Sequence, residues 1–162
     1  MEDEKSELIE LFGIHFERLY NISPLGGRIL ATLVIDGCKS GLTFDTLVEK
    51  MQASKSSVST NLNLLLKTGR IEYFTVAGDR KKYFKAAPLS QRLKNYLTII
   101  DGEKMMIDRL MQFRKKNISC VQEEINFQNM CAYKEHVLQV EQLLLSTINK
   151  FKSIEIKNQS AK

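Results

Sequence analysis

Cysteine, histidine and proline are scarce in this chain of 162 residues, which holds three cysteines, two histidines and two prolines. The cysteines, Cys38, Cys120 and Cys131, include no C-x-x-C pair, which argues against both a disulfide framework and a cysteine zinc site. We expect their thiols to be buried or half-buried. His15 and His136 are far apart in the sequence, and such residues are more often core or surface histidines than ligands or bases.

Motifs for catalysis are missing as well. The chain has no Gly-rich phosphate loop, no H-E-x-x-H zinc motif and no nucleophile elbow around a serine. These absences indicate a protein that is not an enzyme and that uses neither a metal nor a cofactor.

Long apolar runs are also absent. None reaches the roughly 18 residues needed to span a bilayer, and the acidic start MEDEKSE lacks the basic region of a secretion signal. We therefore expect a cytoplasmic protein that has no membrane partner. With 43% hydrophobic and 27% charged residues, the chain can bury a core and gives no compositional sign of disorder.

Positive charge is concentrated in one segment of the chain. Residues 50–85 carry eight bases and two acids, a net charge of +6, whereas the other residues carry sixteen bases and seventeen acids, a net charge of −1. A positive patch attracts polyanions and makes their binding salt-dependent, although charge alone favours a solvated lysine-rich face over a DNA-binding one. The eight bases are Lys50, Lys55, Lys67, Arg70, Arg80, Lys81, Lys82 and Lys85.

Helical spacing and capping residues predict four helices before residue 68. The first, over residues 4–20, has an apolar stripe that we expect to pack against a neighbour, made of Leu8, Leu11, Phe12, Phe16 and Leu19. Ser23 and Pro24 predict the N-cap and first turn of a second helix that stops at Gly37. Thr43 caps a short third helix and Ser54 caps a fourth, so that the last two form a helix-turn-helix pair.

Two glycines stand in the first turn of the second predicted helix. Gly26 and Gly27 lower its helix propensity. Either another backbone approaches closely there or the entry to the helix is irregular.

The fourth predicted helix, over residues 54–67, has an unusually polar outer face. At about 100° per residue, Val58, Leu62 and Leu65 point inward, with Leu66 at the margin. The opposite side presents short hydroxyls, an amide and an ammonium group, which can reach base edges and phosphates in a DNA groove. A generic amphipathic surface helix is the competing interpretation, but so many helix-disfavouring residues make more sense at a functional face. The outward residues are Ser56, Ser57, Thr60, Asn63 and Lys67.

A basic hairpin follows this helix directly. Gly69 ends the helix, and residues 70–76 and 81–86 have β-favouring compositions on either side of a Gly-Asp-Arg turn. Asp79 can accept local hydrogen bonds and orient Arg80, and an arginine at a hairpin tip can enter the minor groove of DNA. A slim polar helix followed by such a hairpin is typical of a winged helix-turn-helix, which places one element in each groove.

These segments resemble the GbsR family of bacterial repressors, a branch of the MarR-like winged-helix regulators. The resemblance rests on SPLGGRI at residues 23–29, SKSSVSTNLNLLLKTGRI at residues 54–71 and GDRKKYF at residues 78–84. It implies a homodimer, a recognition helix over residues 54–67, a wing over residues 70–86 and a dimer contact made by helices at both ends of the chain. By matching position, the recognition signature falls on Ser54, Lys55, Ser57 and Ser59, and the wing tip on Asp79 and Arg80.

Beyond Pro88 the chain becomes a helical arm. One apolar stripe runs from Leu89 to Met111, with a candidate interruption at Asp101 and Gly102, and another helix begins near Ile118. From Met130, apolar positions in steps of three and four mark a seam that meets a partner helix. A winged domain of about 85 residues is too small to bury two such stripes, so part of this surface should pair with a second chain or with the first helix. A helical cap within a monomer is the alternative.

The sequence therefore predicts a mainly α-helical protein with a small β-hairpin. We expect an N-terminal dimer helix over residues 1–22, a winged helix-turn-helix domain over 23–88 and a C-terminal dimerisation arm over 89–162. The predicted DNA contacts are Ser54, Lys55, Ser56, Ser57, Ser59, Thr60, Asn63, Lys67, Arg80, Lys81 and Lys82. Double-stranded DNA is the expected partner, and repression the expected outcome.

Two other functions stay open at this point. The winged helix could be a protein-interaction module that does not bind DNA. One of the three cysteines could sense oxidation, and only Cys38, beside Lys39 in an expected loop, has any sign of an activated thiol. A small-molecule effector could bind near aromatic residues such as Phe12, Phe16, Tyr96, Phe113 and Tyr133, although helical spacing explains all of them as core.

Overall fold

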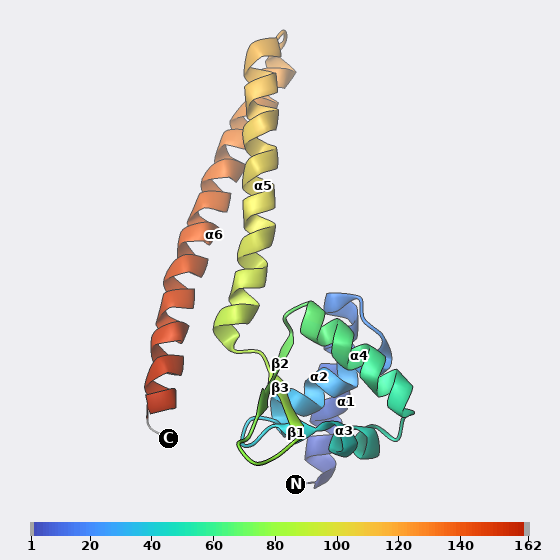
Figure 1. Ribbon diagram of the computed structural model, residues 1–162. Helices are drawn as coiled ribbons and strands as arrows, with labels where there is room; N and C mark the ends of the chain where they lie inside the picture. The colour runs from blue at the N-terminus through green and yellow to red at the C-terminus, as the bar shows by residue number, and fades with distance from the viewer. Residues whose placement is uncertain (1, 161–162) are drawn as a thin grey trace. The chain divides into compact units, whose positions relative to one another are not determined.

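The computed structural model describes residues 2–160 and divides the chain into two compact units, Met1–Ala87 and Pro88–Lys162 (Figure 1). The first unit contains α1 (Glu2–Tyr20), α2 (Pro24–Ile35), β1 (Leu42–Thr43), α3 (Phe44–Met51), α4 (Lys55–Lys67), β2 (Ile71–Thr75) and β3 (Lys82–Ala86). The second unit contains α5 (Leu89–Asn117) and α6 (Val121–Ser160). The mainly helical winged helix-turn-helix fold predicted from the sequence is thus confirmed.

The predicted helix caps of the first unit are confirmed. The hydroxyl oxygen of Ser23 accepts a hydrogen bond from the backbone N–H of Gly26 at 3.0 Å, and that of Thr43 accepts one from Thr46 at 3.2 Å. Ser54 does the same for Ser57 at 3.2 Å. Each bond satisfies an N–H group that the helix itself leaves unpaired, so these residues define where α2, α3 and α4 begin.

The sheet has one strand more than the predicted hairpin. Its three antiparallel strands lie in the order β1-β3-β2, and Phe84 of β3 pairs with Leu42 on one side and Tyr73 on the other. The two-residue strand β1 is too short to leave a clear sequence pattern. Between β2 and β3, Gly78 adopts a φ of +83°, a conformation that glycine adopts without strain.

The core of the first unit lies between α2, α4 and the sheet. Val58, Leu62 and Leu65 are buried as the helical phase predicts, and they share one cluster with residues of α2 and with Ile71 and Phe84 of the sheet. This packing holds α4 against the core through one face only. Its opposite side is left to solvent.

The buried face of α1 differs from the predicted one. Of the expected stripe, only Phe16 enters the core, with 2% of its surface exposed, whereas Leu8, Leu11, Phe12 and Leu19 are exposed. The prediction was wrong because α1 packs on α2 through glycine rather than through its largest side chains. A methyl group on Gly27 would collide with the carbonyl oxygen of Gly13, so the two backbones meet there.

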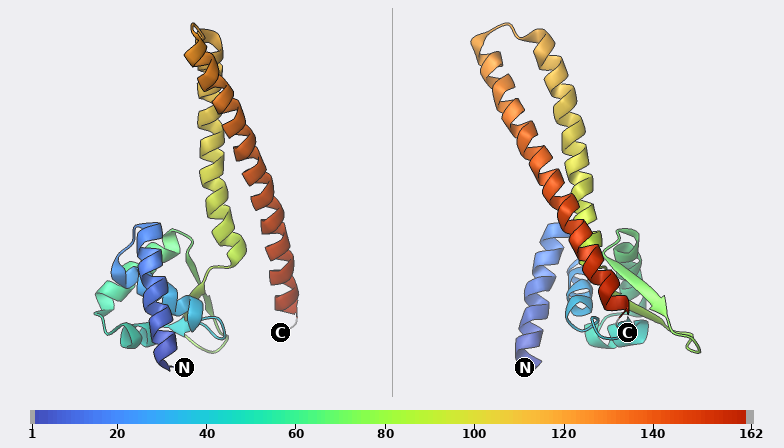
Figure 2. Two further views of the ribbon diagram at one scale, coloured as in Figure 1. Left: turned by 180° about the vertical axis from the view of Figure 1, so that it is seen from behind. Right: turned by 90° about the vertical axis from the view of Figure 1, so that its left-hand side faces the viewer.

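The second unit is a pair of long helices that lie side by side (Figures 1 and 2). The candidate interruption at Asp101 and Gly102 does not occur, since α5 is continuous from Leu89 to Asn117. The apolar seam of α6 faces α5 of the same chain, where Val137 and Ile148 are buried. Among the described residues, no helix is both long and apolar enough to cross a membrane.

Polar contacts also join α5 to α6. The ammonium group of Lys104 lies 2.6 Å from a carboxylate oxygen of Glu141, and this hydrogen bond raises the pKa of Lys104. The hydroxyl of Ser90 donates to Glu155 at 2.7 Å. These pairs set the register of the two helices, because each joins positions far apart in the sequence.

Candidate nucleic-acid interface

The outer face of α4 is exposed in the form that the sequence predicts. Every predicted contact on it is solvent-exposed: Ser54, Lys55, Ser56, Ser57, Ser59, Thr60, Asn63 and Lys67. The side chains of Ser59 and Asn63 form no hydrogen bond with any residue that the structure describes. Their donors and acceptors are therefore available to an external partner.

Two of the α4 hydroxyls already use their protons within the helix. Thr60 Oγ1 donates to the carbonyl oxygen of Ser56 at 2.9 Å, and Ser54 Oγ donates to Ser57 Oγ at 2.8 Å. These oxygens can still accept a hydrogen bond. A DNA base that offers an amino group suits them better than one that offers only a carbonyl oxygen.

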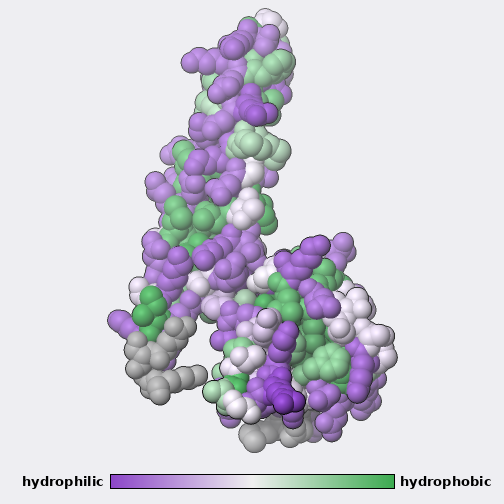
Figure 3. All heavy atoms as spheres, in the orientation of Figure 1, coloured by the Kyte–Doolittle hydropathy of each residue, from purple (hydrophilic) through white to green (hydrophobic). Residues whose placement is uncertain are grey.

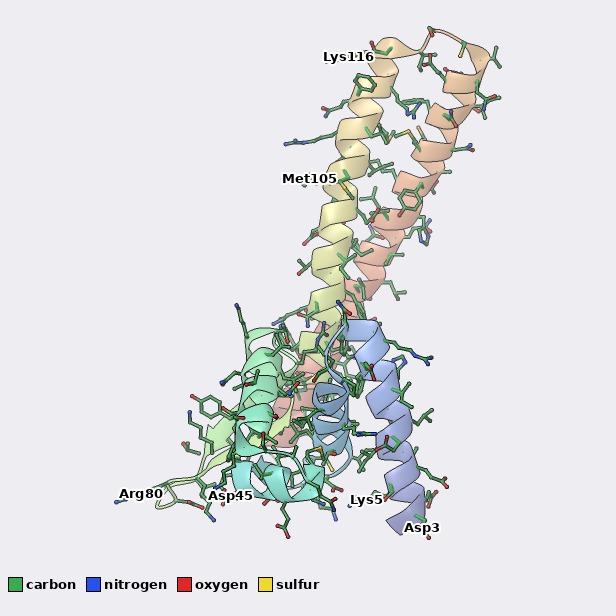
Figure 4. The ribbon with its side chains drawn as sticks, turned by 90° about the vertical axis from the view of Figure 1, so that its right-hand side faces the viewer. Asp3, Lys5, Asp45, Arg80, Met105 and Lys116 are labelled. Atoms are coloured by element: carbon green, nitrogen blue, oxygen red, sulfur yellow. The ribbon has the colours of Figure 1, made fainter. Side chains whose placement is uncertain are left out.

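The wing tip is held by a carboxylate. Asp79 accepts hydrogen bonds from the Tyr83 hydroxyl at 2.7 Å and from the Lys81 backbone N–H at 2.9 Å. The Tyr83 hydroxyl, followed by the Lys81 N–H, lowers the pKa of Asp79. Asp79 therefore accepts local hydrogen bonds as the sequence predicts, and the Arg80 backbone also contributes to the lowered pKa of Asp79. Asp79 thus shapes the backbone of the turn, and Arg80 stands at its far end, pointing outward (Figure 4).

The strands below the tip are braced by aromatic rings. Phe74 stacks on Tyr83 with the ring centroids 5.6 Å apart, so the residue that binds Asp79 is itself held by β2. Lys82 Nζ lies 4.4 Å from the centroid of the Tyr73 ring. Such contacts favour one conformation of the wing.

The cations of the basic segment fall into two groups. Lys50 pairs with Asp36 at 3.0 Å, Lys85 pairs with Glu72 at 2.9 Å, and the Arg70 guanidinium lies 3.2 Å from the centroid of the Tyr20 ring. These three serve the fold. The remaining five form no ion pair with any described residue, although Lys82 contacts the Tyr73 ring, and all are predicted DNA contacts: Lys55, Lys67, Arg80, Lys81 and Lys82.

Sequence reasoning missed two residues of α4. Leu64 lies beside Thr60 on the outer side and is 42% exposed, but it stands in a run of leucines and reads as core. An apolar side chain there can contact the methyl group of a thymine. Asn61 is half-buried and turned toward α2, and only a contact across 38 residues reveals its partner.

The cysteines are not where the sequence predicts them. Cys38, Cys120 and Cys131 are all exposed, so the expectation of buried or half-buried thiols is wrong. Each lies on a polar helix end, loop or outer helix face, which sequence alone does not separate from core. No group of three or more metal-binding side chains occurs among the described residues.

A cleft of about 340 Å³ lies within the first unit, between α1, α2 and the end of α3. Its charged groups are already paired, since Asp36 bridges Lys5 and Lys50, and Arg28 binds Glu10. Burial alone would raise the pKa of Asp36, but the hydrogen bonds from Lys5 and Lys50 together lower it. The aromatic residues predicted to line an effector site do not line this cleft, and Phe16 is in the core.

Known proteins resemble this chain in sequence and in fold. No protein-family model matches the chain. It is 33% identical over 87 residues to the HTH-type transcriptional regulator MmpR5 of Mycobacterium tuberculosis (strain ATCC 25618 / H37Rv), a match that covers 54% of this chain and 52% of that protein. The chain thus spans about half the length of this curated relative.

Two solved structures resemble the chain to different degrees. The crystal structure of a protein described as a transcriptional regulator aligns with a TM-score of 0.65 at 21% identity, over 93% of this chain and 99% of that one. The S. aureus MepR–DNA complex aligns with a TM-score of 0.41 at 20% identity, over 68% of this chain and 90% of that one. The first of these likenesses shows a shared fold.

Proposed function

We propose that this chain is a DNA-binding transcription regulator of the MarR-like type, as its resemblance to the GbsR family implies, and that it represses transcription as a homodimer. The observation that carries the proposal is the sorting of the basic segment. Ion pairs hold Lys50 and Lys85, and ring contacts hold Arg70 and Lys82. The other four cations, Lys55, Lys67, Arg80 and Lys81, form neither contact with any described residue, and they lie on α4 and at the wing tip, the two elements that enter DNA grooves in a winged helix.

Each predicted contact has a role in this proposal. Ser56, Ser57, Thr60 and Asn63 read base edges in the major groove, while Lys55 and Lys67 hold phosphates. The N-terminus of α4, capped by Ser54 and followed at Ser59 by a further free hydroxyl, approaches the backbone. Arg80 enters the minor groove, and Lys81 and Lys82 bind the phosphates on either side.

The dimer part of the proposal rests on apolar side chains that nothing in the described chain covers. On α5, Ile99, Met106 and Phe113 are exposed at intervals of seven residues, and Leu110 lies beside them. A seven-residue repeat keeps such side chains on one face of a helix, which is the pattern of a helix that packs against another. Figure 3 shows apolar side chains interspersed with polar ones along the visible face of this unit.

The first unit has exposed apolar side chains of its own. Leu8, Leu11, Phe12 and Leu19 are all exposed on α1. We propose that these residues and those of the α5 stripe become buried when they pack against a second copy of the chain. A two-fold dimer of winged domains places its recognition helices about 34 Å apart, so its operator is a pseudo-palindrome.

A binding experiment at two salt concentrations tests the proposal. The wild-type protein first selects duplexes from fragments of its own genome, and fluorescence anisotropy then gives the affinity for a selected duplex and for a scrambled one. We expect tight, sequence-dependent binding whose affinity falls steeply with salt, because each phosphate contact releases a counterion. Binding that ignores both sequence and salt would refute the proposal.

The wing offers a matched pair of variants for the same assay. Arg80→Gln and Lys85→Gln each remove one positive charge from the wing, but only Lys85 is paired with an acid. We expect Arg80→Gln to weaken binding about tenfold and Lys85→Gln to change it less than about twofold. Equal effects would mean that total charge, rather than the wing tip, determines the affinity.

The two alternatives have different signatures in this assay. A protein-interaction module without DNA binding selects no duplex. A thiol sensor loses DNA binding on mild peroxide treatment and recovers it with a reductant, and a Cys38→Ser variant no longer responds if Cys38 is the sensor.

A further inference from the structure

Asn61 occupies an unusual place on the recognition helix. At about 100° per residue it lies roughly 60° from Val58, at the edge of the buried face, whereas Thr60 and Asn63 lie on the opposite side. The residue is half-buried and faces the start of α2. Its side chain is directed toward Ser23 rather than outward with Thr60 and Asn63.

The Asn61 side chain uses both of its polar ends. Its Nδ2 group donates to the carbonyl oxygen of Ser57 at 2.9 Å, and its Oδ1 atom accepts the Ser23 hydroxyl at 2.5 Å. The Ser23 oxygen accepts the Gly26 N–H at the same time. One continuous set of hydrogen bonds therefore joins the N-cap of α2 to the first turns of α4.

Gly26 makes room for this contact. A Cβ atom on Gly26 would lie 2.8 Å from Asn61 Oδ1 and 3.3 Å from Ser23 Oγ. Any larger residue would push the amide away from the serine. The glycine in the first turn of α2 is thus explained by the approach of a side chain from α4.

We propose that Ser23, Gly26 and Asn61 form a clamp that sets the rotation and tilt of α4, and that this clamp controls how well the protein distinguishes its operator from other DNA. The inference rests on the proposed function of DNA binding. Asn61 is a positioning residue in it. The apolar contacts of Val58, Leu62 and Leu65 hold α4 against the core but leave it free to roll slightly, whereas directional hydrogen bonds fix the roll.

Sequence reading depends on this roll more than phosphate binding does. A base-edge contact requires a donor and an acceptor to meet within a few tenths of an ångström. A lysine on a flexible stem can still reach a phosphate after a small rotation. Loss of the clamp should therefore lower specific affinity and leave non-specific affinity unchanged.

Three substitutions that leave the net charge unchanged each disrupt a different part of the clamp. Asn61→Ala removes both of its hydrogen bonds and introduces a better helix former, so that overall stability should change little. Ser23→Gly removes the donor, and glycine is still a tolerated N-cap. Gly26→Ala displaces the amide while both hydrogen-bonding residues, Asn61 and Ser23, stay unsubstituted. Ser23→Thr is the conservative control because it keeps the hydroxyl.

Affinity is measured for a selected duplex and for a scrambled one. We expect each of the three variants to reduce the ratio of the two affinities about tenfold, with the salt dependence of binding unchanged. Ser23→Thr should retain the ratio. The Asn61→Ala/Ser23→Gly double variant should be no worse than either single one, since both remove the same contact.

Hydrogen exchange of the free protein gives a readout without DNA. Amides in the first half of α4 should exchange faster in Asn61→Ala, while those of the α2 core keep their protection. An unchanged affinity ratio, additive losses in the double variant, or unchanged exchange in α4 would each overturn the clamp. If the wild-type protein prefers no sequence, the proposed function fails and the role of Asn61 in DNA reading fails with it, whereas the exchange result still tells whether the clamp exists.

Discussion

The two units of this chain differ in how completely they bury their apolar residues. In the winged unit, eleven buried hydrophobic residues form one cluster that spans α1, α2, α3, α4 and the sheet. In the helical unit, the described residues bury only Ile107, Val137 and Ile148 to a similar degree. The winged unit has the core of an independent domain, whereas the helical unit leaves about half of its large apolar side chains exposed.

This difference indicates which kind of partner the surface of each unit suits. A finished core lets the winged unit expose polar and cationic groups, whose natural partner is a polyanion. The many exposed apolar side chains give the helical unit a reason to associate, because burying them against a partner removes apolar surface from water. The sharpest tests are those that affect one unit and leave the other unchanged.

The largest expected effect comes from the α5 stripe. Replacing Ile99, Met106 and Phe113 together by glutamate places three charges on the proposed dimer face. We expect a monomer in sedimentation experiments and a loss of DNA affinity on the order of a thousandfold, because the second half-site no longer binds within the same molecule. The circular dichroism of the winged unit should not change. A dimer that survives these substitutions would place the interface elsewhere.

A pair of leucine truncations comes next in size. Leu65 has no exposed surface, and Leu65→Ala should lower the free energy of unfolding by about 3 kcal/mol at any protein concentration. Leu110 is 44% exposed in the single chain, so the cost of Leu110→Ala should depend on concentration and appear as weaker dimerisation. Thermal unfolding over a range of concentrations separates the two. Identical behaviour would show that the units do not differ as described.

Neutralising one lysine in each unit should have a smaller effect. Lys67→Gln and Lys134→Gln change the net charge equally, but Lys134 is paired with Asp108 on the arm at 2.5 Å. We expect Lys67→Gln to reduce the salt slope of DNA binding by about one and Lys134→Gln to leave the slope unchanged. Titrations at several salt concentrations measure this. An equal change in both slopes would point to a general effect of charge.

The smallest effect is the pH response of the wing. The Tyr83 hydroxyl and the Lys81 N–H lower the pKa of Asp79 in the folded chain, so this carboxylate favours the ordered turn above its unfolded pKa of about 3.9. That contribution is lost as the pH falls through the folded value. Tyr83→Phe should raise the pKa of Asp79 toward its ordinary value, as measured by an NMR titration. An unchanged pKa would show that the Tyr83 hydroxyl does not stabilise the Asp79 carboxylate in the turn.

Local features of the fold were predictable from the sequence. A serine or threonine cap acts over three residues, so Ser23, Thr43 and Ser54 predict the helix starts without knowledge of the rest of the chain. The inner face of α4 follows from spacing alone, because its neighbours cover a full side of the helix. The exposure of the predicted DNA contacts also agrees with the helical phase, while their role in binding stays a prediction.

Features that depend on contacts between distant segments were not predictable. The face that α1 buries is chosen by the glycine contact with α2, which outweighs the larger apolar area of Leu11 and Leu19. Counting charges treats Lys50 and Lys85 as members of the basic patch, although Asp36 and Glu72 neutralise them in the fold. The contact between Asn61 and Ser23 joins residues that are 38 positions apart in the sequence, and no local sequence pattern predicts it.

Hydroxyl-radical footprinting of the protein on a selected duplex tests the central claim most directly, because it reports the recognition helix, the wing and the dimer at once. We expect two protected segments related by two-fold symmetry, with centres about one helical turn apart, and protection of the adjacent minor grooves that disappears in Arg80→Gln. A single protected segment, or a footprint that Arg80→Gln leaves intact, would contradict it.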